Sequence, residues 1–299
     1  MRIPDATPPV SICRSCGFVT ISPRYSPADY REINARWYPL KFSMHPPEDP
    51  SESIKFQKWR VMWDRIGMYY PDGPTSVLDV GAGQGWAIEF LLSKFSDLEA
   101  VAIEQWKPCQ EYIRNSLGAQ IVDVSITDDW PSDLHGRFDL VILRHTLEHL
   151  EEPLKTLQQI GKCLSPEGHL YLVVPDAMSI KAGTPMRTYA FRPLHLHYFN
   201  RYTLGRMARL GGLYPLTMDD SVTTGDHGET WGLFGNTDRS LMDEAFYTFN
   251  SYATQREYLL ERMAMAGKER GRILKSWLRP FVPELVLNVS RRLVSGPGK

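Results

Sequence analysis

The chain has 299 residues, a length that fits one large α/β domain or two small ones, with 34 lysines and arginines against 35 aspartates and glutamates. A net charge of -1 lacks the basic surface that grips a nucleic-acid backbone, so no nucleic-acid partner is expected. No apolar run approaches the roughly 18 residues of a membrane span and the amino terminus has no apolar signal core, so the expected location is cytoplasmic.

Residues 1–50 are expected to form a small amino-terminal cap. They are rich in proline and are expected to be irregular, except that Ser26-Pro27-Ala28-Asp29 supplies an N-cap, a first-turn proline and an acid. This pattern predicts a short helix from Pro27 to Trp37. Three prolines between Ser43 and Pro50 interrupt both helix and sheet, so this stretch is the expected linker.

From Ser51 onward, helical and strand patterns alternate. Trp59, Met62 and Ile66 recur at helical spacing, which predicts an amphipathic helix. Short apolar runs bounded by turns predict strands at Ser76–Val80, Ala100–Ile103, Gln120–Val124, Phe138–Leu143 and His169–Val174. Helices are expected between them at Trp86–Phe95, Pro108–Leu117 and Leu147–Leu164. This alternation predicts an α/β fold with a doubly wound parallel sheet.

The last third of the chain has weaker patterns. Two further strands are expected at Leu213–Met218 and Thr230–Asn236, so the central domain should cover residues 51–237. Residues 238–299 are expected to form a helical carboxyl-terminal extension. Its tail, from Trp277 to Leu293, places aromatic and aliphatic residues beside arginines, a composition that predicts peripheral membrane contact or packing on the domain itself.

Three glycines directly follow the first strand of the central domain, in the segment Asp79-Val80-Gly81-Ala82-Gly83-Gln84-Gly85-Trp86. Glycines at such a turn let a cofactor approach the backbone closely. Trp86 stands where a dinucleotide fingerprint needs its third glycine, and the Lys-Ser/Thr of a P-loop is missing, so neither NAD nor a P-loop nucleotide is expected.

The segment resembles the first motif, D-x-G-x-G-x-G, of class I S-adenosylmethionine-dependent methyltransferases, and the resemblance covers the order of elements from Trp59 to Gly212. It implies a Rossmann-like, seven-stranded methyltransferase sheet with S-adenosyl-L-methionine as the cofactor.

The resemblance also implies roles for individual residues. Asp79 would contact the amino-acid end of the cofactor, and Gly81, Gly83 and Gly85 would pass beneath it. Glu104, at the end of the second strand, would hold the two ribose hydroxyls, since a carboxylate accepts several hydrogen bonds. The alternative is that the glycines only ease a tight turn and that Glu104 is a surface acid.

Two further cofactor contacts are implied at the ends of the third and fourth strands. The family motif can be aligned with the segment after the third strand in two ways. Ser125 and Ile126 are the expected adenine contacts, and Asp123 is the contact in the alternative alignment. Arg144 lies where family members keep the methionine end of the cofactor, so it is counted among the cofactor-binding residues.

The segment after Arg144 resembles the L-E-H-x-x-x-P signature of small-molecule methyltransferases, with Pro153 in place. In some quinone-type relatives, two acids and a histidine here bind a divalent metal, but this chain has His145 in place of the first acid. Glu148 and His149 match the other two positions. The substitution weakens the metal interpretation, but histidine and glutamate both bind several transition metals, so Glu148 and His149 stay the weaker, metal-binding alternative. The favoured expectation is no metal site, with Glu148 as an early-helix acid near the helix dipole and His149 hydrogen-bonded locally.

A long insertion, about residues 176–199, follows the fifth strand and is the expected substrate lid, because loops at the carboxyl ends of parallel strands hold substrate. Transfer of a methyl group to oxygen needs a base, and imidazole suits this task near neutral pH. His195 and His197 are the candidate catalytic bases, followed by His145. For each of them, a purely structural role is the alternative.

Cys13-Arg14-Ser15-Cys16-Gly17 is half of a zinc knuckle. It resembles the second knuckle of the zinc ribbon at the amino terminus of certain sugar-modifying methyltransferases, although the first pair is missing here. One alternative is a zinc site whose remaining ligands come from His45 or from a second chain. The other is a turn that binds no metal. The other two cysteines, Cys109 and Cys163, are expected to pack in the core.

The expected function is methyl transfer from S-adenosyl-L-methionine to a hydroxyl of a small molecule or glycan, with a sugar or nucleotide-linked sugar favoured over a phenol, quinone or natural product. A non-catalytic binding protein with the same fold is the alternative from another class. A second copy of the chain, in a homodimer, is a further expected partner.

Overall fold

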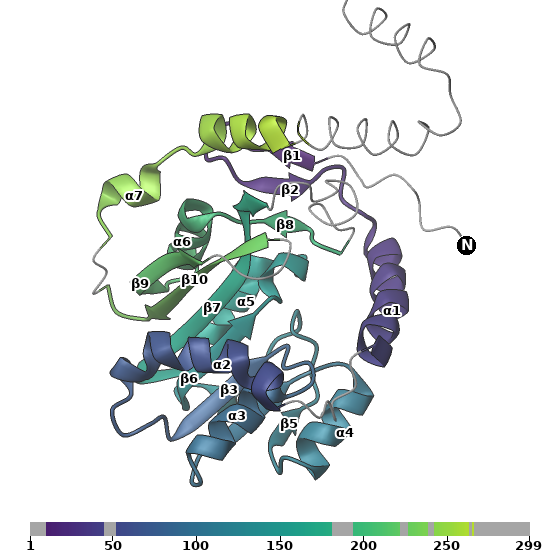
Figure 1. Ribbon diagram of the computed structural model, residues 1–299, viewed down its shortest axis with the longest axis vertical. Helices are drawn as coiled ribbons and strands as arrows, with labels where there is room; N and C mark the ends of the chain where they lie inside the picture. Colours follow the sequence, from purple (N-terminus) through teal and green to yellow (C-terminus); the bar gives the residue numbers. More distant parts are fainter. Residues whose placement is uncertain are drawn as a thin grey trace, which may run out of the picture.

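The computed structural model describes residues 10–44, 52–180, 194–221, 227–238, 242–262 and 265, and a seven-stranded sheet forms its centre (Figure 1). The strands are β3 (Ser76–Val80), β4 (Glu99–Ile103), β5 (Gln120–Val122), β6 (Phe138–Arg144), β7 (Leu164–Ile180), β9 (Tyr214–Ser221) and β10 (His227–Gly235). Their order is β5-β4-β3-β6-β7-β10-β9. Only β10 runs against its neighbours in this described sheet, pairing antiparallel with both β7 and β9. The predicted α/β class and seven-stranded sheet are confirmed.

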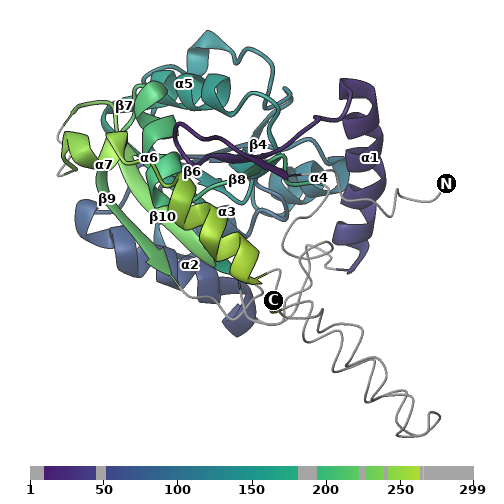
Figure 2. The same ribbon diagram turned by 90° about the horizontal axis from the view of Figure 1, so that it is seen from above.

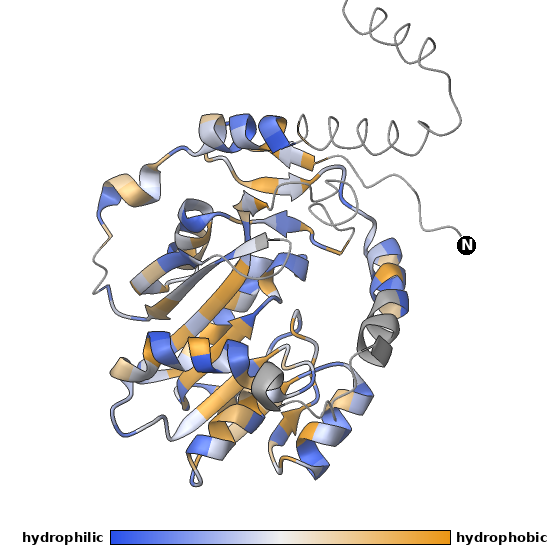
Figure 3. Ribbon diagram, viewed as in Figure 1, coloured by the Kyte–Doolittle hydropathy of each residue, from blue (hydrophilic) through white to orange (hydrophobic). Residues whose placement is uncertain are grey.

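Helices cover both faces of this sheet, as Figure 2 shows with α5 on one side of the strands and α2 on the other. The helices that follow or precede the strands are α2 (Glu52–Ile66), α3 (Trp86–Lys94), α4 (Lys107–Asn115), α5 (Pro153–Cys163) and α6 (Arg201–Leu210), with short 3-10 turns η1 (Gly67–Tyr69) and η2 (Ser132–Leu134). Val77 and the next residue, Leu78, belong to different core clusters, because successive side chains of a strand point to opposite faces. Both faces are therefore buried, which explains the apolar strands in Figure 3.

The helix expected from Leu147 begins later, at Pro153. Residues Leu147–His149 form a separate 3-10 turn, η3, instead. Proline fits the first turn of a helix but cannot donate within it, so Pro153 starts α5 instead of continuing an earlier helix. As a result Glu148 lies in a turn at the carboxyl end of β6 and is not an early-helix acid.

Strand β7 extends to Ile180, six residues beyond the expected end at Val174. The extension is stabilised by β10, whose pairing with β7 continues to the pair His227 and Ile180. Much of the expected lid, residues 181–193, lies outside the described residues. Its last part contains the two-residue strand β8 (His197–Tyr198).

The expectation of an irregular amino-terminal segment is wrong for residues 10–21. They form a hairpin of β1 (Val10–Ile12) and β2 (Val19–Ile21), and β2 pairs with β8 to make a second, three-stranded antiparallel sheet. Strands of three residues are too short to show an alternating pattern in the sequence. Helix α1 (Pro27–Met44) also continues past its expected end at Trp37.

The region expected to be helical from about residue 239 contains α7 (Glu244–Thr248) and a separate helix at 252–262. This second helix lies over β1 and β2 in Figure 1. Ser251 Oγ donates to the Cys16 carbonyl at 3.1 Å, and Gln255 Nε2 donates to the Ala177 carbonyl at 3.2 Å. The hairpin, the end of β7 and this helix therefore pack together.

Within the described residues, none of the helices has the length and apolar character that crossing a membrane requires. The tail for which membrane contact is expected, Trp277 to Leu293, lies outside the described residues, as does His45.

Candidate functional site

The glycine loop turns sharply at the carboxyl end of β3. Gly81, Gly83 and Gly85 have φ angles of 73°, 55° and 72°, a region that side-chain-bearing residues rarely adopt. The Gly81 N–H donates to the Ile103 carbonyl at 2.8 Å, which ties the loop to the end of β4. A Cβ atom on Gly81 would lie 2.6 Å from Thr146 Oγ1. The loop thus needs glycine at Gly81 both for its conformation and for the close approach of a neighbouring side chain.

Glu104 lies directly under this loop and is only 2% exposed. Its Oε2 accepts a hydrogen bond from the Gly83 N–H at 2.7 Å, and its Oε1 accepts from the N–H groups of Gln105 and Trp106 at 2.8 Å each. The alternative of a surface acid does not fit this burial. The carboxylate therefore joins the glycine loop to the residues that follow β4, and its role in holding the ribose stays a prediction.

Asp79 is the second buried acid of the site, at 4% exposure. Burial, and then the negative charge of Glu104, raise the pKa of Asp79 to about 8. At pH 7 the carboxyl group is therefore mainly protonated when no cofactor is bound. A cation placed beside it would lower this pKa again.

We expect the binding of S-adenosylhomocysteine to release about one proton from Asp79 at pH 7, because the ammonium group of the ligand's amino-acid end would stabilise the carboxylate. Calorimetric titration in two buffers of different ionisation enthalpy measures this release. An Asp79→Asn variant that binds the ligand should release none. Equal proton release by the variant and the unaltered protein would contradict the prediction.

The expected adenine contacts lie beyond the end of β5. Ser125 Oγ accepts a hydrogen bond from Gln105 Nε2 at 2.9 Å, so the loop after β5 meets the segment that follows Glu104. Ile126 is 8% exposed. Asp123, the alternative adenine contact, instead forms an ion pair with Lys107 of α4 at 3.0 Å. This arrangement favours Ser125 and Ile126 over Asp123, and their role stays a prediction.

The end of β6 carries a charged cluster that local sequence patterns do not reveal. His145 Nε2 lies 2.7 Å from Glu229 Oε1, and the Arg144 guanidinium donates to the same carboxylate. His145 has a φ of 51°, the one non-glycine residue with positive φ among those described. Such strain costs on the order of 1–3 kcal/mol and is typical of functional sites.

The charges of this cluster are coupled. Burial, followed by the neighbouring Arg144 guanidinium, lowers the pKa of His145 to about 4. Burial opposes ionisation of Glu229, but the hydrogen bond with His145 and the charge of Arg144 lower the pKa of this carboxyl to about 2. Glu229 lies on β10, 84 residues after His145, so sequence reasoning missed it. Its carboxylate holds the imidazole in one orientation.

The structure separates the histidines expected as bases. His197 is 1% exposed, with Nε2 donating to the Leu150 carbonyl at 3.0 Å and Nδ1 3.3 Å from Thr20 Oγ1. Its ring also stacks on Phe18, with centroids 5.4 Å apart. These contacts join the hairpin to the lid end and favour a structural role for His197. His195 lies elsewhere, against the ring of His149, with centroids 4.7 Å apart.

Glu148, His149 and His195 form a group of potential metal ligands, each offering one atom within 4.8 Å of the others. The sequence had indicated only the first two. His145 Nδ1 and His149 Nε2 each lie 3.8 Å from Glu148 Oε1, so one buried carboxylate stands between these two imidazoles. This part of the site is formed by three segments: the end of β6, the turn η3, and the residues Leu194 and His195.

The two cysteines of the knuckle lie in the turn of the amino-terminal hairpin, with Cys13 exposed and Cys16 partly buried. The Ser15 backbone N–H lowers the pKa of Cys13, whereas burial raises that of Cys16. Cys109 and Cys163 are buried in the core, as expected.

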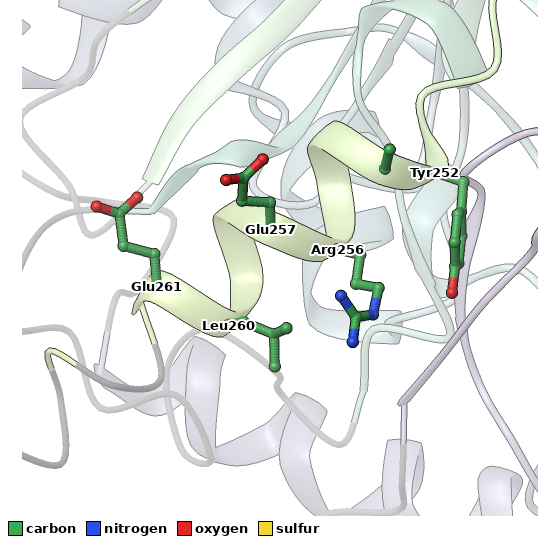
Figure 4. A pocket seen from close by; sticks show the side chains of 6 residues that line it. Tyr252, Arg256, Glu257, Leu260 and Glu261 are labelled. Carbon is green, nitrogen blue, oxygen red and sulfur yellow. The ribbon is translucent and has the colours of Figure 1, made fainter.

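A surface hollow runs along the helix at 252–262 (Figure 4). It is lined by Tyr252, Ala253, Arg256, Glu257, Leu260 and Glu261. All of these residues belong to a single helix, and none comes from the glycine loop or from the ends of β3, β4 or β6. This hollow therefore shares no residue with the glycine loop, and the cofactor-binding role of that loop stays a prediction.

A family model described as a methyltransferase domain matches residues 52–217, more than half of the chain. The chain therefore belongs to the methyltransferase-domain family, and the expected enzyme class and its cofactor, S-adenosyl-L-methionine, are confirmed at the level of the family.

Individual relatives are more distant. The malonyl-[acyl-carrier protein] O-methyltransferase of Acetivibrio thermocellus is 28% identical over 94 residues, which is 31% of this chain and 33% of that protein. The chain thus matches about a third of the length of this curated relative.

Solved structures show a similar fold. The 1,6-didemethyltoxoflavin-N1-methyltransferase of Burkholderia thailandensis, bound to 1,6-didemethyltoxoflavin and S-adenosylhomocysteine, has a TM-score of 0.55 and 17% identity, over 74% of this chain and 96% of that one. A plantazolicin methyltransferase bound to a triazolic substrate analogue and S-adenosylhomocysteine has a TM-score of 0.54 and 12% identity, over 70% and 96% of the two chains.

Proposed function

We propose that this protein transfers the methyl group of S-adenosyl-L-methionine to a hydroxyl of a small-molecule or glycan acceptor. The observation that carries this proposal is the imidazole of His145, held by Glu229 at 2.7 Å at the end of β6. Thr146, the next residue, packs against Gly81 of the glycine loop. A base is therefore placed beside the loop that would hold the methyl donor.

In this reaction the acceptor oxygen attacks the methyl carbon as the carbon–sulfur bond breaks. The electron pair of that bond stays on sulfur, which leaves S-adenosylhomocysteine, and the hydroxyl proton passes to the base. The sulfonium already supplies the driving force, so the protein mainly contributes positioning and deprotonation. Because Nε2 of His145 points at Glu229, its Nδ1 is the atom that would take the proton.

The nature of the acceptor has separate support. The relative in Acetivibrio thermocellus is named an O-methyltransferase, which supports oxygen, whereas the Burkholderia enzyme is named an N1-methyltransferase. The half zinc knuckle at Cys13 and Cys16 resembles that of sugar-modifying enzymes, which favours a sugar or nucleotide-linked sugar. A phenol, quinone or natural product is the next candidate. Glycan binding, a homodimer, membrane contact through the tail and a cytoplasmic location stay predictions.

Release of S-adenosylhomocysteine during incubation with nucleotide sugars, free sugars and phenols tests the proposal directly. We expect turnover with at least one hydroxyl acceptor, and mass spectrometry should locate the new methyl group on oxygen. A product methylated on nitrogen or carbon would overturn the choice of atom. Failure of the protein to bind S-adenosylhomocysteine would favour the non-catalytic alternative.

Replacing His145 with alanine should lower turnover by about 100-fold or more, the usual contribution of a general base, and leave S-adenosylhomocysteine affinity within about threefold. A matched control is His135→Ala, because His135 is an exposed histidine in the turn that precedes β6. Its turnover should be unchanged. Retained turnover in His145→Ala would remove this imidazole from the mechanism.

A further inference from the structure

Three side chains from two distant segments converge beside His145, the proposed base. Glu148 and His149 come from the turn η3, and His195 comes from the segment after residues 181–193. Glu148 is 1% exposed and His195 is 7% exposed. Each of the three offers one oxygen or nitrogen within 4.8 Å of the other two. This is the donor set, two imidazoles and one carboxylate, that suits divalent transition metals better than magnesium or calcium.

The hydrogen bond of His149 gives a second, independent indication. Its Nδ1 lies 2.9 Å from the Leu194 carbonyl oxygen. A carbonyl only accepts, so Nδ1 carries the hydrogen and the lone pair of the neutral ring is on Nε2. This Nε2 lies 3.8 Å from Glu148 Oε1. Metal-binding histidines are commonly oriented in this way, with the other ring nitrogen bonded to a carbonyl or carboxylate.

His145 is oriented in a similar way, with one ring nitrogen at a hydrogen-bond acceptor and the other near Glu148. Its Nε2 lies 2.7 Å from Glu229 Oε1, and its Nδ1 lies 3.8 Å from Glu148 Oε1. Because the Glu229 carboxylate accepts, the lone pair of the neutral ring is on Nδ1 and faces Glu148. A cation bound by Glu148 and His149 would therefore lie close to Nδ1 of His145, the atom proposed to take the acceptor proton.

The spacing fits a small ion. With bonds of about 2.0–2.2 Å, neighbouring ligand atoms of a tetrahedral zinc site lie about 3.4 Å apart. The separation of 3.8 Å between Glu148 Oε1 and His149 Nε2 would need to shorten by about 0.4 Å to reach this value, and separations that involve the ligand atom of His195, which lie within 4.8 Å, by up to about 1.4 Å.

We propose that Glu148, His149 and His195 bind one divalent transition-metal ion of the zinc class, with His145 Nδ1 beside it. The sequence had favoured no metal, because His145 stands in place of an acid. The structure adds His195, which lies far along the chain. The binding of the ion does not depend on the proposed function, but the role of the ion rests on that function. A bound ion would polarise the acceptor hydroxyl and ease the deprotonation of this hydroxyl.

The experiment is a zinc titration followed by calorimetry, on protein freed of metal by dialysis against a chelator. It is carried out in a Cys13→Ser, Cys16→Ser background, so that the thiol pair in the hairpin turn does not contribute. We expect one zinc ion per chain. His195→Ala should weaken its binding by at least about 100-fold, since loss of a ligand should exceed the 10- to 100-fold effect of an outer-shell change.

Glu148→Gln is a second variant, with the same expected loss, and His135→Ala is the control that should bind zinc normally. Cobalt replaces zinc in a parallel measurement, and its visible absorption should show a tetrahedral site that His195→Ala abolishes. No stoichiometric zinc in the parent protein, or normal zinc binding by His195→Ala, overturns the proposal.

Titration of each variant with S-adenosylhomocysteine separates this result from the proposed function. We expect the cofactor affinity of His195→Ala to equal that of the parent, which shows that the variant is folded. Methyl transfer to a hydroxyl that continues at the full rate in chelator, without zinc binding, would leave the proposed function in place and reject the metal site. Zinc binding without any methyl transfer would support the metal site and reject the proposed function.

Discussion

Replacing Gly81 with alanine should strongly weaken the binding of S-adenosylhomocysteine. The φ of Gly81 is 73°, where a side chain costs about 1–2 kcal/mol. The new Cβ would also lie 2.6 Å from Oγ1 and 2.9 Å from Cγ2 of Thr146, a residue that is only 8% exposed. The glycine loop must therefore move away from the end of β6. We expect affinity to fall by about 100-fold or more, since every 1.4 kcal/mol is tenfold.

Gly118→Ala is the matched control for this experiment. Gly118 has a φ of 69°, almost the same as that of Gly81, but a Cβ there would meet no atom within 4 Å. Both variants thus share the backbone cost, and only Gly81→Ala adds the clash. Calorimetric titration of the two proteins should show normal ligand affinity for Gly118→Ala. Equal affinity in both variants would show that the loop at Gly81 does not hold the cofactor.

The second large effect is expected for Glu104→Ala. The carboxylate accepts hydrogen bonds from the N–H groups of Gly83, Gln105 and Trp106, so its removal leaves three donors without this acceptor. It would also remove the expected acceptor for two ribose hydroxyls. Hydrogen bonds to a charged group contribute about 1.5–3 kcal/mol each, so the loss of two corresponds to about 100-fold or more in ligand affinity.

Glu104→Gln tests whether charge or shape matters, because it keeps the size of the side chain and presents an amide in place of the carboxylate. We expect an affinity between those of the parent and of Glu104→Ala. Glu99→Ala is the control, since Glu99 begins the same strand and forms an exposed ion pair with Arg137. Unchanged S-adenosylhomocysteine affinity in Glu104→Ala would reject the ribose role.

Parts of the site could be predicted because their residues are neighbours along the chain. The expected strand Ser76–Val80 agrees with β3, and Gly81 follows it directly, so strand, turn and helix are local. Glu104 follows β4, and the carboxyl ends of adjacent parallel strands meet at one edge of a sheet. The contact between Glu104 and Gly83 across that edge therefore agrees with a spacing visible in the sequence.

The histidines show where such reasoning stops. His195 and His197 are two residues apart, yet one lies beside Glu148 and the other is held by Leu150 and the hairpin. In an extended segment, side chains two residues apart point to the same face. The sequence alone therefore predicts the same surroundings for both histidines. Their different surroundings come from η3 and β2, which approach this segment from elsewhere in the chain.

The sequence by itself determined the class of fold and the glycine turn, because these depend on apolar periodicity and on turns of a few residues, whereas Asp79 and Glu104 were indicated by the resemblance to a family and their burial came from the structure. Only the tertiary structure decided that Glu229 holds His145, that His195 joins Glu148 and that β1 and β2 pair with the lid end. Contacts of this kind join segments that are far apart along the chain. They are set by how the layers pack, and no local pattern of residue types records them.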